Sequence, residues 1–283
     1  MANLPPGTIE LIERALDEDL GSGDVTAEAT VPADTRAQAH LIQKQPGVIF
    51  GLDIAEEVFR RVGADEFDRT VIEGHWHDSV PRDIALIHGP ARALLAGERV
   101  ALNFIGHLSG ISTMTARFVE AVAGTGTKIL DTRKTTPGLR LLEKRAVTFG
   151  GGMNHRVGLF DAVLIKENHI AMAGGVSEAI VASRRASPDI QIEVEAEDLD
   201  EVRAALEAGA DRILLDNMDN AQMAEAVAIR DREGPKVELE ASGGVNLENV
   251  AAIARTGVDF ISIGALTHSA PSLDVSLLLK PLS

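Results

Sequence analysis

Six short apolar runs between residues 128 and 265 decide the fold of this chain. They are KILDTRK (128–134), DAVLIKENH (161–169), IQIEVEAE (190–197), RILLDN (212–217), VELEASGG (237–244) and FISIGA (260–265). Each run ends in polar residues and is followed by a helix-like stretch. Strands that alternate with helices at this spacing form a parallel sheet. Six such units in a row, apolar on both faces, predict a parallel α/β barrel.

The first hundred residues follow a different pattern. Residues 37–44, 69–77 and 82–89 are strand-like, and residues 52–62 have the apolar periodicity of a helix. This mixture predicts a small α+β domain ahead of the barrel.

The domain boundaries follow from these two patterns. We expect an N-terminal domain at residues 1–112 and a catalytic barrel at residues 113–269. The apolar tail 270–283 is expected to return to the first domain.

Composition excludes several classes of protein. The chain has 43 acidic and 27 basic residues and a net charge of −16, which argues against a nucleic-acid partner. It has no cysteine, so disulfides, thiolate catalysis and cysteine-based metal sites are excluded. No apolar run approaches the roughly 20 residues that span a membrane, and the N-terminus lacks a signal-peptide pattern. We therefore expect a cytoplasmic protein without a membrane partner.

One region is basic within this acidic chain. Residues 128–169 hold eight bases against four acids, which predicts a small polyanionic ligand. Four of the bases follow predicted strands, where side chains point into the barrel mouth: Arg133, Lys134, Arg156 and Lys166. Three others share a predicted helix, where a solvent-facing position explains them equally well: Arg140, Lys144 and Arg145.

The later strands end in acids and glycines. Glu195 and Asp216 close two strands, where carboxylates bind a metal, contact sugar hydroxyls or pair with neighbouring bases. Residues 242–244 (SGG) and 264–265 (GA) follow the next two strands, at the usual phosphate site of a barrel. The combination predicts a phosphorylated sugar and a second, acidic partner as ligands.

Several longer motifs resemble the quinolinate phosphoribosyltransferase family, also called nicotinate-nucleotide pyrophosphorylase (carboxylating). The most specific are DTRKTTPGLR (131–140), GGGMNHR (150–156) and LIKENH (164–169). The similarity also includes ERVALN (98–103), HLSG (107–110), EVE (193–195), LDN (215–217) and EASGG (240–244), and so covers essentially the whole chain.

The resemblance implies a fold and a reaction. The fold would be an open α/β barrel with an N-terminal α/β sandwich. The enzyme, a pentosyltransferase, would join quinolinate to phosphoribosyl pyrophosphate. The products would be nicotinate mononucleotide, pyrophosphate and CO2, a step of NAD biosynthesis that uses Mg2+. The working unit would be a homodimer or a higher homo-oligomer.

The resemblance also implies roles for individual residues. The quinolinate carboxylates would be held by Arg99, Arg133, His155, Arg156 and Lys166, with Arg99 reaching into the site of the partner subunit. The catalytic groups that face phosphoribosyl pyrophosphate would be Lys134, Glu195 and Asp216, with both acids near Mg2+. The 5′-phosphate would be cradled by Ser242, Gly243, Gly244, Gly264 and Ala265.

Three alternatives stay open at this point. Lys166 ends an apolar run, as the nucleophile of a Schiff-base aldolase-type barrel does. A family paralogue of different specificity would retain most of the motifs. A non-catalytic phosphosugar-binding module would bind the ligand without releasing pyrophosphate.

Overall fold

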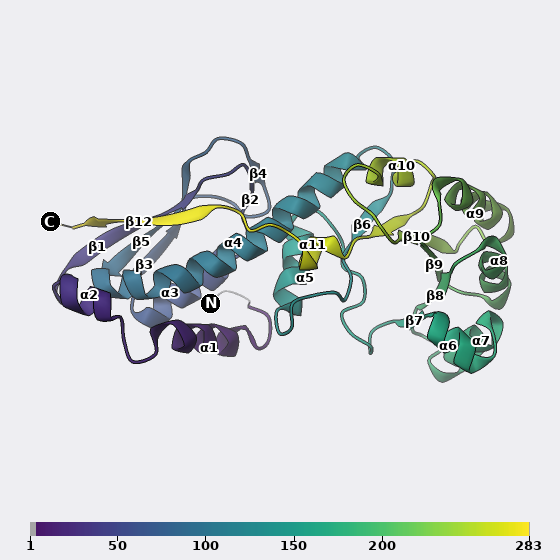
Figure 1. The fold of residues 1–283 in the computed structure, drawn as a ribbon, viewed down its shortest axis with the longest axis horizontal. Coiled ribbons are helices and arrows are strands. Elements are labelled where there is room, and N and C mark those ends of the chain that lie inside the picture. Colours follow the sequence, from purple (N-terminus) through teal and green to yellow (C-terminus); the bar gives the residue numbers. More distant parts are fainter. Residues whose placement is uncertain (1–3, 283) are drawn as a thin grey trace. The chain divides into compact units, whose positions relative to one another are not determined.

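The computed structural model describes residues 4–282 and divides the chain into two compact units (Figure 1). The first unit comprises residues through Ala116, residues 136–151 and residues from Ser269 on, and the second comprises 117–135 and 152–268. The sequence patterns predict residues 136–151 as part of the barrel instead. The segment joins the first unit because its helix α5 (Arg140–Phe149) packs on α4 (Ala91–Ala121), where Ser112 Oγ donates to Ala146 O at 2.7 Å.

An antiparallel sheet forms the frame of the first unit. Its strand order is β12-β1-β5-β3, and Figure 1 shows yellow β12 beside purple β1. The strands are β1 (Arg36–Gln43), β3 (Glu66–Arg69), β5 (Arg82–Pro90) and β12 (Val275–Pro281). Alternate residues of β1 are buried, as expected for a sheet with one face on a core. The C-terminal tail thus supplies a strand to the N-terminal sheet.

Helices cover this sheet, and two short strands pair beside it. The remaining elements are α1 (Thr8–Leu20), α2 (Val25–Thr30), α3 (Leu52–Val62), β2 (Gly47–Val48) and β4 (Trp76–His77). Helix α3 has the range predicted from its apolar face. The run 69–77 is not one strand, because β3 ends at Arg69 and only Trp76 and His77 pair with β2.

The second unit is built on a six-stranded parallel sheet of order β6-β11-β10-β9-β8-β7. Its strands are β6 (Lys128–Leu130), β7 (Val163–Ile165), β8 (Ile192–Ala196), β9 (Arg212–Asp216), β10 (Glu238–Ser242) and β11 (Phe260–Ser262). Its helices are α6 (Glu167–Ala173), α7 (Val176–Ala186), α8 (Leu199–Ala208), α9 (Asn220–Glu233), α10 (Val250–Ala254) and α11 (Ala265–His268). Each predicted apolar run contains one of these strands.

The barrel is open between β6 and β7, which are the two edges of the sheet. At the β6 edge a loop takes the place of a strand: Met153 forms a parallel bridge with Leu130, and its N–H donates to Ile129 O at 2.8 Å. The prediction of an open parallel barrel with an N-terminal α+β domain is confirmed. Within residues 4–282, no helix has the length and apolar character that crossing a bilayer requires.

Candidate active site

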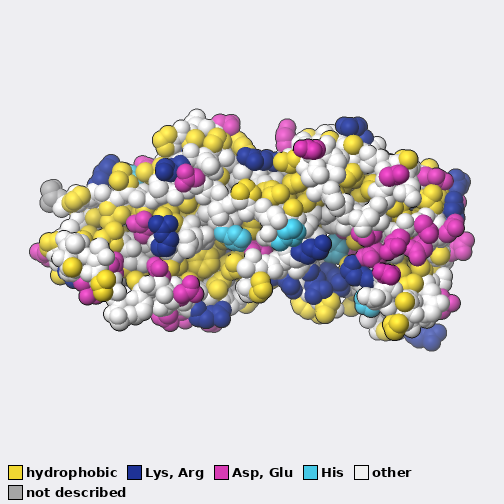
Figure 2. All heavy atoms as spheres, in the orientation of Figure 1, with side chains coloured by type: hydrophobic (Ala, Val, Ile, Leu, Met, Phe, Trp, Pro, Cys, Tyr) yellow, Lys and Arg dark blue, Asp and Glu magenta, His cyan; other side chains and the backbone are white. Residues whose placement is uncertain are grey.

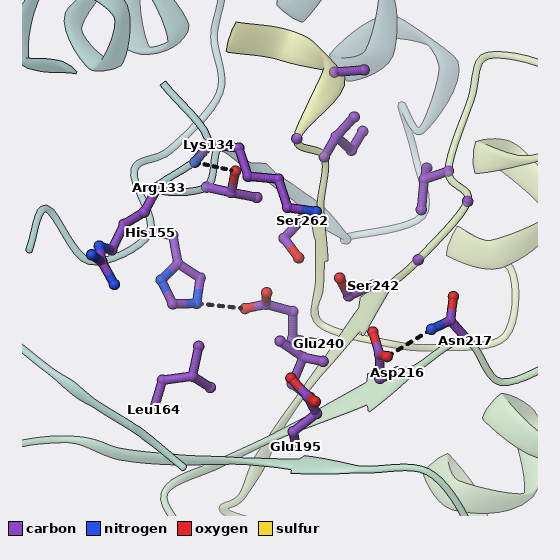
Figure 3. A pocket seen from close by; sticks show the side chains of 18 of the residues that line it. Arg133, Lys134, His155, Leu164, Glu195, Asp216, Asn217, Glu240, Ser242 and Ser262 are labelled. Carbon is purple, nitrogen blue, oxygen red and sulfur yellow. Dashed lines mark hydrogen bonds and ion pairs between the residues drawn. The ribbon is translucent and has the colours of Figure 1, made fainter. Parts of the chain in front are cut away.

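A large cavity lies where the parallel strands of the second unit end. Its volume is about 820 Å³. Twelve of the thirteen predicted site residues line it: Arg133, Lys134, His155, Arg156, Lys166, Glu195, Asp216, Ser242, Gly243, Gly244, Gly264 and Ala265. In Figure 3, Arg133 and Lys134 extend from the loop after β6, and Glu195 and Asp216 come from neighbouring strands. The ends of parallel strands meet at one edge, which explains the convergence.

Arg99 is the predicted residue that this cavity lacks. It lies on α4 in the first unit, with its side chain 63% exposed and 3.9 Å from the carboxylate of Glu98.

The sequence analysis missed several lining residues. They are Thr132, Leu164, Leu214, Asn217, Glu240, Val245, Ser262, Ile263 and His268. Glu240 could have been singled out from the sequence, because it stands in the middle of an apolar strand, and an acid that is buried there needs a polar partner.

Positively charged side chains form one wall of the cavity. Burial and the positive charge of Arg133 lower the pKa of Arg156, and both residues line the cavity. Arg156 Nη1 donates to Ala162 O at 3.3 Å, while its buried Nε has no hydrogen-bond partner among residues 4–282. Figure 2 shows Lys and Arg side chains gathered on one face of this unit, beside a run of acids. Such a wall favours a ligand with carboxylate groups.

The three other predicted bases take no part in this wall. Helix α5 carries them in the first unit, where Lys144 is buried and Arg145 lies over the ring of Phe50 at 5.6 Å. A fully solvated helix face is therefore the wrong description for Lys144.

The main chain of Lys134 is fixed on both sides. Its N–H donates to Thr132 Oγ1 at 3.1 Å, and its carbonyl accepts from Thr267 Oγ1 at 2.7 Å. A Cβ at Gly264 would lie 3.1 Å from Lys134 Cδ, so the lysine stem passes directly over this glycine. The main chain that carries the Lys134 ammonium group into the cavity is therefore held in place.

Two carboxylates face the cavity from adjacent strands. Burial and the negative charge of Glu195 raise the pKa of Asp216, although Lys166, Lys134 and Asn217 oppose this effect. Lys166 Nζ forms an ion pair with Glu195, and Asn217 Nδ2 donates to Asp216 Oδ2 at 2.6 Å. The pair therefore concentrates negative charge beside the basic wall.

The turn after β10 requires glycine. Gly243 has a φ of 97°, and a Cβ there would come within 2.1 Å of Asn217 Oδ1. Asn217 itself has a φ of 54°, and its N–H donates to Ser242 O at 3.0 Å. The backbone can approach a ligand closely at this turn, as a phosphate site needs.

A largely buried polar network reaches the cavity, and two of its members, His155 and Glu240, line it. His155 Nε2 is 2.9 Å from Glu193 Oε2 and 3.6 Å from Glu240 Oε2, and Figure 3 shows His155 pointing toward Glu240. Arg212 Nη1 donates to Glu240 at 3.2 Å, and its Nη2 donates to Glu238 at 2.8 Å. Burial disfavours the charged imidazole, but the hydrogen bond with Glu193 and the charge of Glu240 outweigh it and raise the pKa of His155.

Replacing Glu240 with glutamine is expected to flatten the pH dependence of stability. Burial and the charge of Glu193 raise the pKa of Glu240 from 4.5 to about 7. Between these values the folded protein holds a proton that the unfolded chain has released. The free energy of unfolding therefore falls as pH rises through this window, by roughly 2–3 kcal/mol. Urea unfolding at about pH 5 and about pH 8 measures the fall.

The matched control is Glu238→Gln. It removes a more exposed carboxylate that pairs with Arg212, the arginine that also binds Glu240. It should retain most of the wild-type pH dependence. An equal fall in the free energy of unfolding for Glu240→Gln and the wild type would contradict the assignment.

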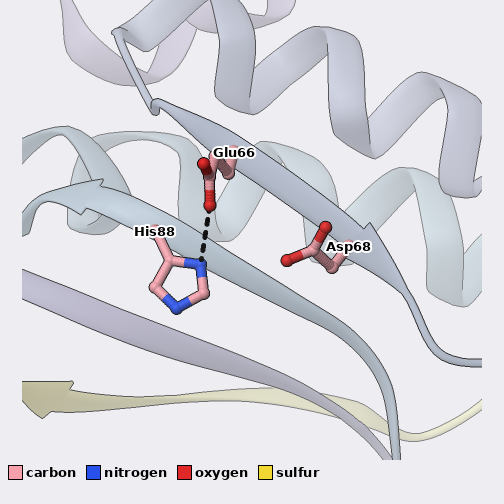
Figure 4. Close-up of side chains that lie close together, drawn as sticks. All are labelled: Glu66, Asp68 and His88. Atoms are coloured by element: carbon pink, nitrogen blue, oxygen red, sulfur yellow. Dashed lines mark ion pairs between the residues drawn. The ribbon is translucent and has the colours of Figure 1, made fainter.

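A second group of titratable side chains lies on the sheet of the first unit. Figure 4 shows Glu66, Asp68 and His88 on adjacent strands, with His88 Nδ1 3.8 Å from the Glu66 carboxylate. The Glu66 side chain is 70% exposed, and surface pairs of this kind contribute little to stability. No function is assigned to this group.

Comparison with known proteins identifies relatives over the whole chain. Residues 24–109 match the family model "Quinolinate phosphoribosyl transferase, N-terminal domain", and residues 111–278 match the corresponding C-terminal domain. The nicotinate-nucleotide pyrophosphorylase [carboxylating] of Mycobacterium leprae (strain TN) is 46% identical over 273 residues, which cover 95% of each protein. The probable enzyme of the same name from Bacillus subtilis (strain 168) is 42% identical, covering 95% of this chain and 92% of the relative.

Solved structures agree with these matches. The nicotinate-nucleotide pyrophosphorylase of Francisella tularensis is 38% identical, with a TM-score of 0.93 and 98% of each chain covered. NadC from Streptococcus pyogenes is 39% identical, with a TM-score of 0.93 and full coverage of both chains. These similarities extend through both units and through the residues of the cavity. The chain belongs to the quinolinate phosphoribosyltransferase family.

Proposed function

We propose that this chain transfers the phosphoribosyl group of phosphoribosyl pyrophosphate to quinolinate. The products are nicotinate mononucleotide, pyrophosphate and CO2, and the reaction belongs to NAD biosynthesis. One observation carries the proposal: in a member of this family, a single cavity combines a basic wall, two carboxylates and glycine turns. These three features match the two carboxylates of quinolinate and the ribose and phosphates of the second substrate.

The basic wall binds the acceptor. Quinolinate is a dianion whose adjacent carboxylates suit the planar fork of a guanidinium group. Arg133 and Arg156 supply two such groups, and Lys166 adds an ammonium. Several charge-assisted bonds fix the ring nitrogen toward the ribose C1, and orientation of this kind lowers a barrier by up to about 7–11 kcal/mol.

The other side of the cavity binds the sugar donor. The turns at Ser242–Gly244 and Gly264 offer close backbone approach for the 5′-phosphate. As pyrophosphate leaves, C1 gains positive charge, which the carboxylates of Glu195 and Asp216 stabilise. The Lys134 ammonium stabilises the negative charge that grows on the leaving group.

Decarboxylation follows from the transfer itself. Once its nitrogen is bonded to ribose, the pyridine ring is cationic, and its charge stabilises the electron pair that the broken C–CO2 bond leaves on the adjacent ring carbon. A proton from water then takes the place of CO2 on that carbon. No imine is needed, and the Lys166 Nζ that an imine would use is engaged in an ion pair with Glu195. A Schiff-base mechanism is therefore disfavoured.

The acidic pair fits a magnesium ion. Mg2+ prefers oxygen ligands and is commonly bound by one or two carboxylates together with substrate phosphates. Glu195 and Asp216 provide such oxygens, and the repulsion that raises the pKa of Asp216 is what a divalent cation would relieve. When bound, Mg2+ would neutralise charge on the pyrophosphate.

Chelation is expected to stop turnover. With excess chelator the rate should fall by about a hundredfold or more, because a metal ion contributes several kcal/mol of charge stabilisation. Added Mg2+ should restore the rate, and quinolinate binding measured by calorimetry serves as the control for an intact basic wall. Full activity in excess chelator would contradict the role of the ion.

The direct test supplies quinolinate, phosphoribosyl pyrophosphate and Mg2+ and measures nicotinate mononucleotide and released CO2. Replacing quinolinate by other pyridine carboxylates tests a paralogue of different specificity. A non-catalytic binding module would bind both substrates without releasing pyrophosphate. Trapping by borohydride with a carbonyl substrate would favour the Schiff-base alternative.

Two further features belong to the proposal. We propose a homodimer or a higher homo-oligomer in which Arg99 completes the acceptor site of the partner subunit. Its guanidinium is exposed and lies 3.9 Å from the Glu98 carboxylate, so it is available for such a contact. The cytoplasmic location expected from the sequence stays a prediction.

A further inference from the structure

The mechanism above does not use Glu193, one of the buried acids of the barrel. Glu193 lies on β8, two residues before Glu195, and its side chain is 4% exposed. It does not line the cavity, so it cannot touch a substrate there. We propose that Glu193 is a positioning residue for the acceptor subsite, acting through His155 on the main chain of Arg156. The inference rests on the proposed function, because it concerns quinolinate binding.

A chain of two hydrogen bonds joins Glu193 to Arg156. The backbone N–H of Arg156 donates to His155 Nδ1 at 2.7 Å, so this ring nitrogen presents its lone pair. The proton of the imidazole is then on Nε2, which lies 2.9 Å from Glu193 Oε2. Glu193 thus selects the tautomer and the ring orientation that hold the Arg156 main chain.

The network is buried and has its own source of positive charge. The His155 side chain is 8% exposed, and Glu240 is fully buried. Two neighbouring carboxylates in such a place need a compensating cation. The guanidinium of Arg212 provides it, because it donates to Glu240 at 3.2 Å. Glu193 and Glu240 each keep one buried oxygen without a hydrogen-bond partner among residues 4–282, so the network depends on the contacts with His155 and Arg212.

The arrangement gives His155 a different role from the one implied by the family resemblance. Both ring nitrogens have partners within the protein, so in this geometry the ring supports the main chain of Arg156. A second hydrogen bond holds the same loop: the backbone N–H of His155 donates to the buried Asp131 carboxylate at 2.9 Å. The ligand contact then falls to Arg156, whose buried Nε has no partner within residues 4–282. Because a guanidinium fork must match a carboxylate in direction, the placement of this main chain determines acceptor affinity.

The first test separates the two substrates. Glu193→Ala is expected to raise the KM and Kd for quinolinate by about ten- to a hundredfold, the loss typical of a charge-assisted hydrogen bond. The values for phosphoribosyl pyrophosphate should stay within about twofold, since its groups bind elsewhere in the cavity. Glu193→Gln should lie between wild type and Glu193→Ala, because its amide oxygen still accepts from Nε2.

The matched control is Glu238→Gln. Glu238 binds the same Arg212 but makes no contact with His155, and it does not line the cavity. This variant loses the same charge and should retain the wild-type KM for quinolinate. Equal losses for both substrates in Glu193→Ala, or an equal quinolinate defect in Glu238→Gln, would overturn the proposal.

A second test uses the wild-type protein and does not depend on variant folding. Nitrogen NMR of labelled histidines at mildly alkaline pH reports which ring nitrogen carries the proton, with His155 assigned from the signal lost in His155→Gln. We expect a protonated Nε2 and an unprotonated Nδ1, both before and after quinolinate is added. A proton on Nδ1 in the complex would return His155 to direct ligand binding and would overturn the role of Glu193. Absence of nicotinate mononucleotide with wild-type protein would contradict the proposed function instead.

Discussion

Replacing Arg156 with alanine is expected to lower kcat/KM for quinolinate by about a hundredfold or more. The Arg156 guanidinium belongs to the basic wall of the cavity together with Arg133, and its buried Nε has no hydrogen-bond partner within residues 4–282. Each charge-assisted bond to a carboxylate contributes about 1.5–3 kcal/mol, and a fork makes two. Most of that stabilisation disappears with the side chain. Steady-state kinetics with each substrate varied in turn measures the loss.

The loss should be selective for quinolinate. Calorimetry is expected to show nearly unchanged affinity of Arg156→Ala for phosphoribosyl pyrophosphate. Arg203→Ala is the matched control, because it removes an arginine that pairs with Asp200 on a helix outside the cavity. Equal losses for the two ligands in Arg156→Ala would contradict the assignment of the basic wall to the acceptor.

Lys134→Ala and Arg99→Ala are each expected to be nearly inactive, and their mixture is expected to recover activity. Removing the charge that stabilises a leaving group costs about 10²–10³-fold in kcat. If the partner subunit's Arg99 completes each site, a hybrid dimer has one site in which both residues are intact. Random subunit exchange should then return about a quarter of the wild-type activity. Activity measured against mixing ratio, with exchange shown by mass, tests this.

The control mixture combines two variants of the same cavity. Lys134→Ala with Arg156→Ala should recover nothing, because both residues line the cavity of one chain. Recovery in this control would show that subunit exchange alone raises activity. Proven exchange without recovery between Lys134→Ala and Arg99→Ala would count against a shared site.

Local sequence patterns predicted most of the fold. The apolar face of residues 52–62 gave helix α3 with its observed range, and all six barrel runs contain strands. The run 69–77 failed because a distant contact interrupts it. Glu73 accepts hydrogen bonds from the N–H groups of Gly51 and Leu52, at 2.6 and 2.8 Å, and so caps a helix. Alternating apolarity carries no information about such a partner.

The site was predictable where strand ends determine it. Lys134, Glu195 and Asp216 each end or follow a predicted strand, so their convergence follows from barrel topology. The hydrogen bonds of His155 were not predictable, because Glu193 and Glu240 come from strands far along the chain. The sequence did indicate that both acids need buried polar partners, because each of them interrupts an apolar strand.

The pairing of β12 with β1 has a consequence for synthesis on the ribosome. Residues 91–274 are made after β5 and before β12, yet β12 covers the free edge of β1. At about 5–20 residues per second, translation of this stretch takes roughly 10–40 seconds. During that time the nascent N-terminal sheet carries an uncovered edge, the kind of surface that invites aggregation. The sheet of the first unit therefore reaches its final form only after the whole second unit has been made.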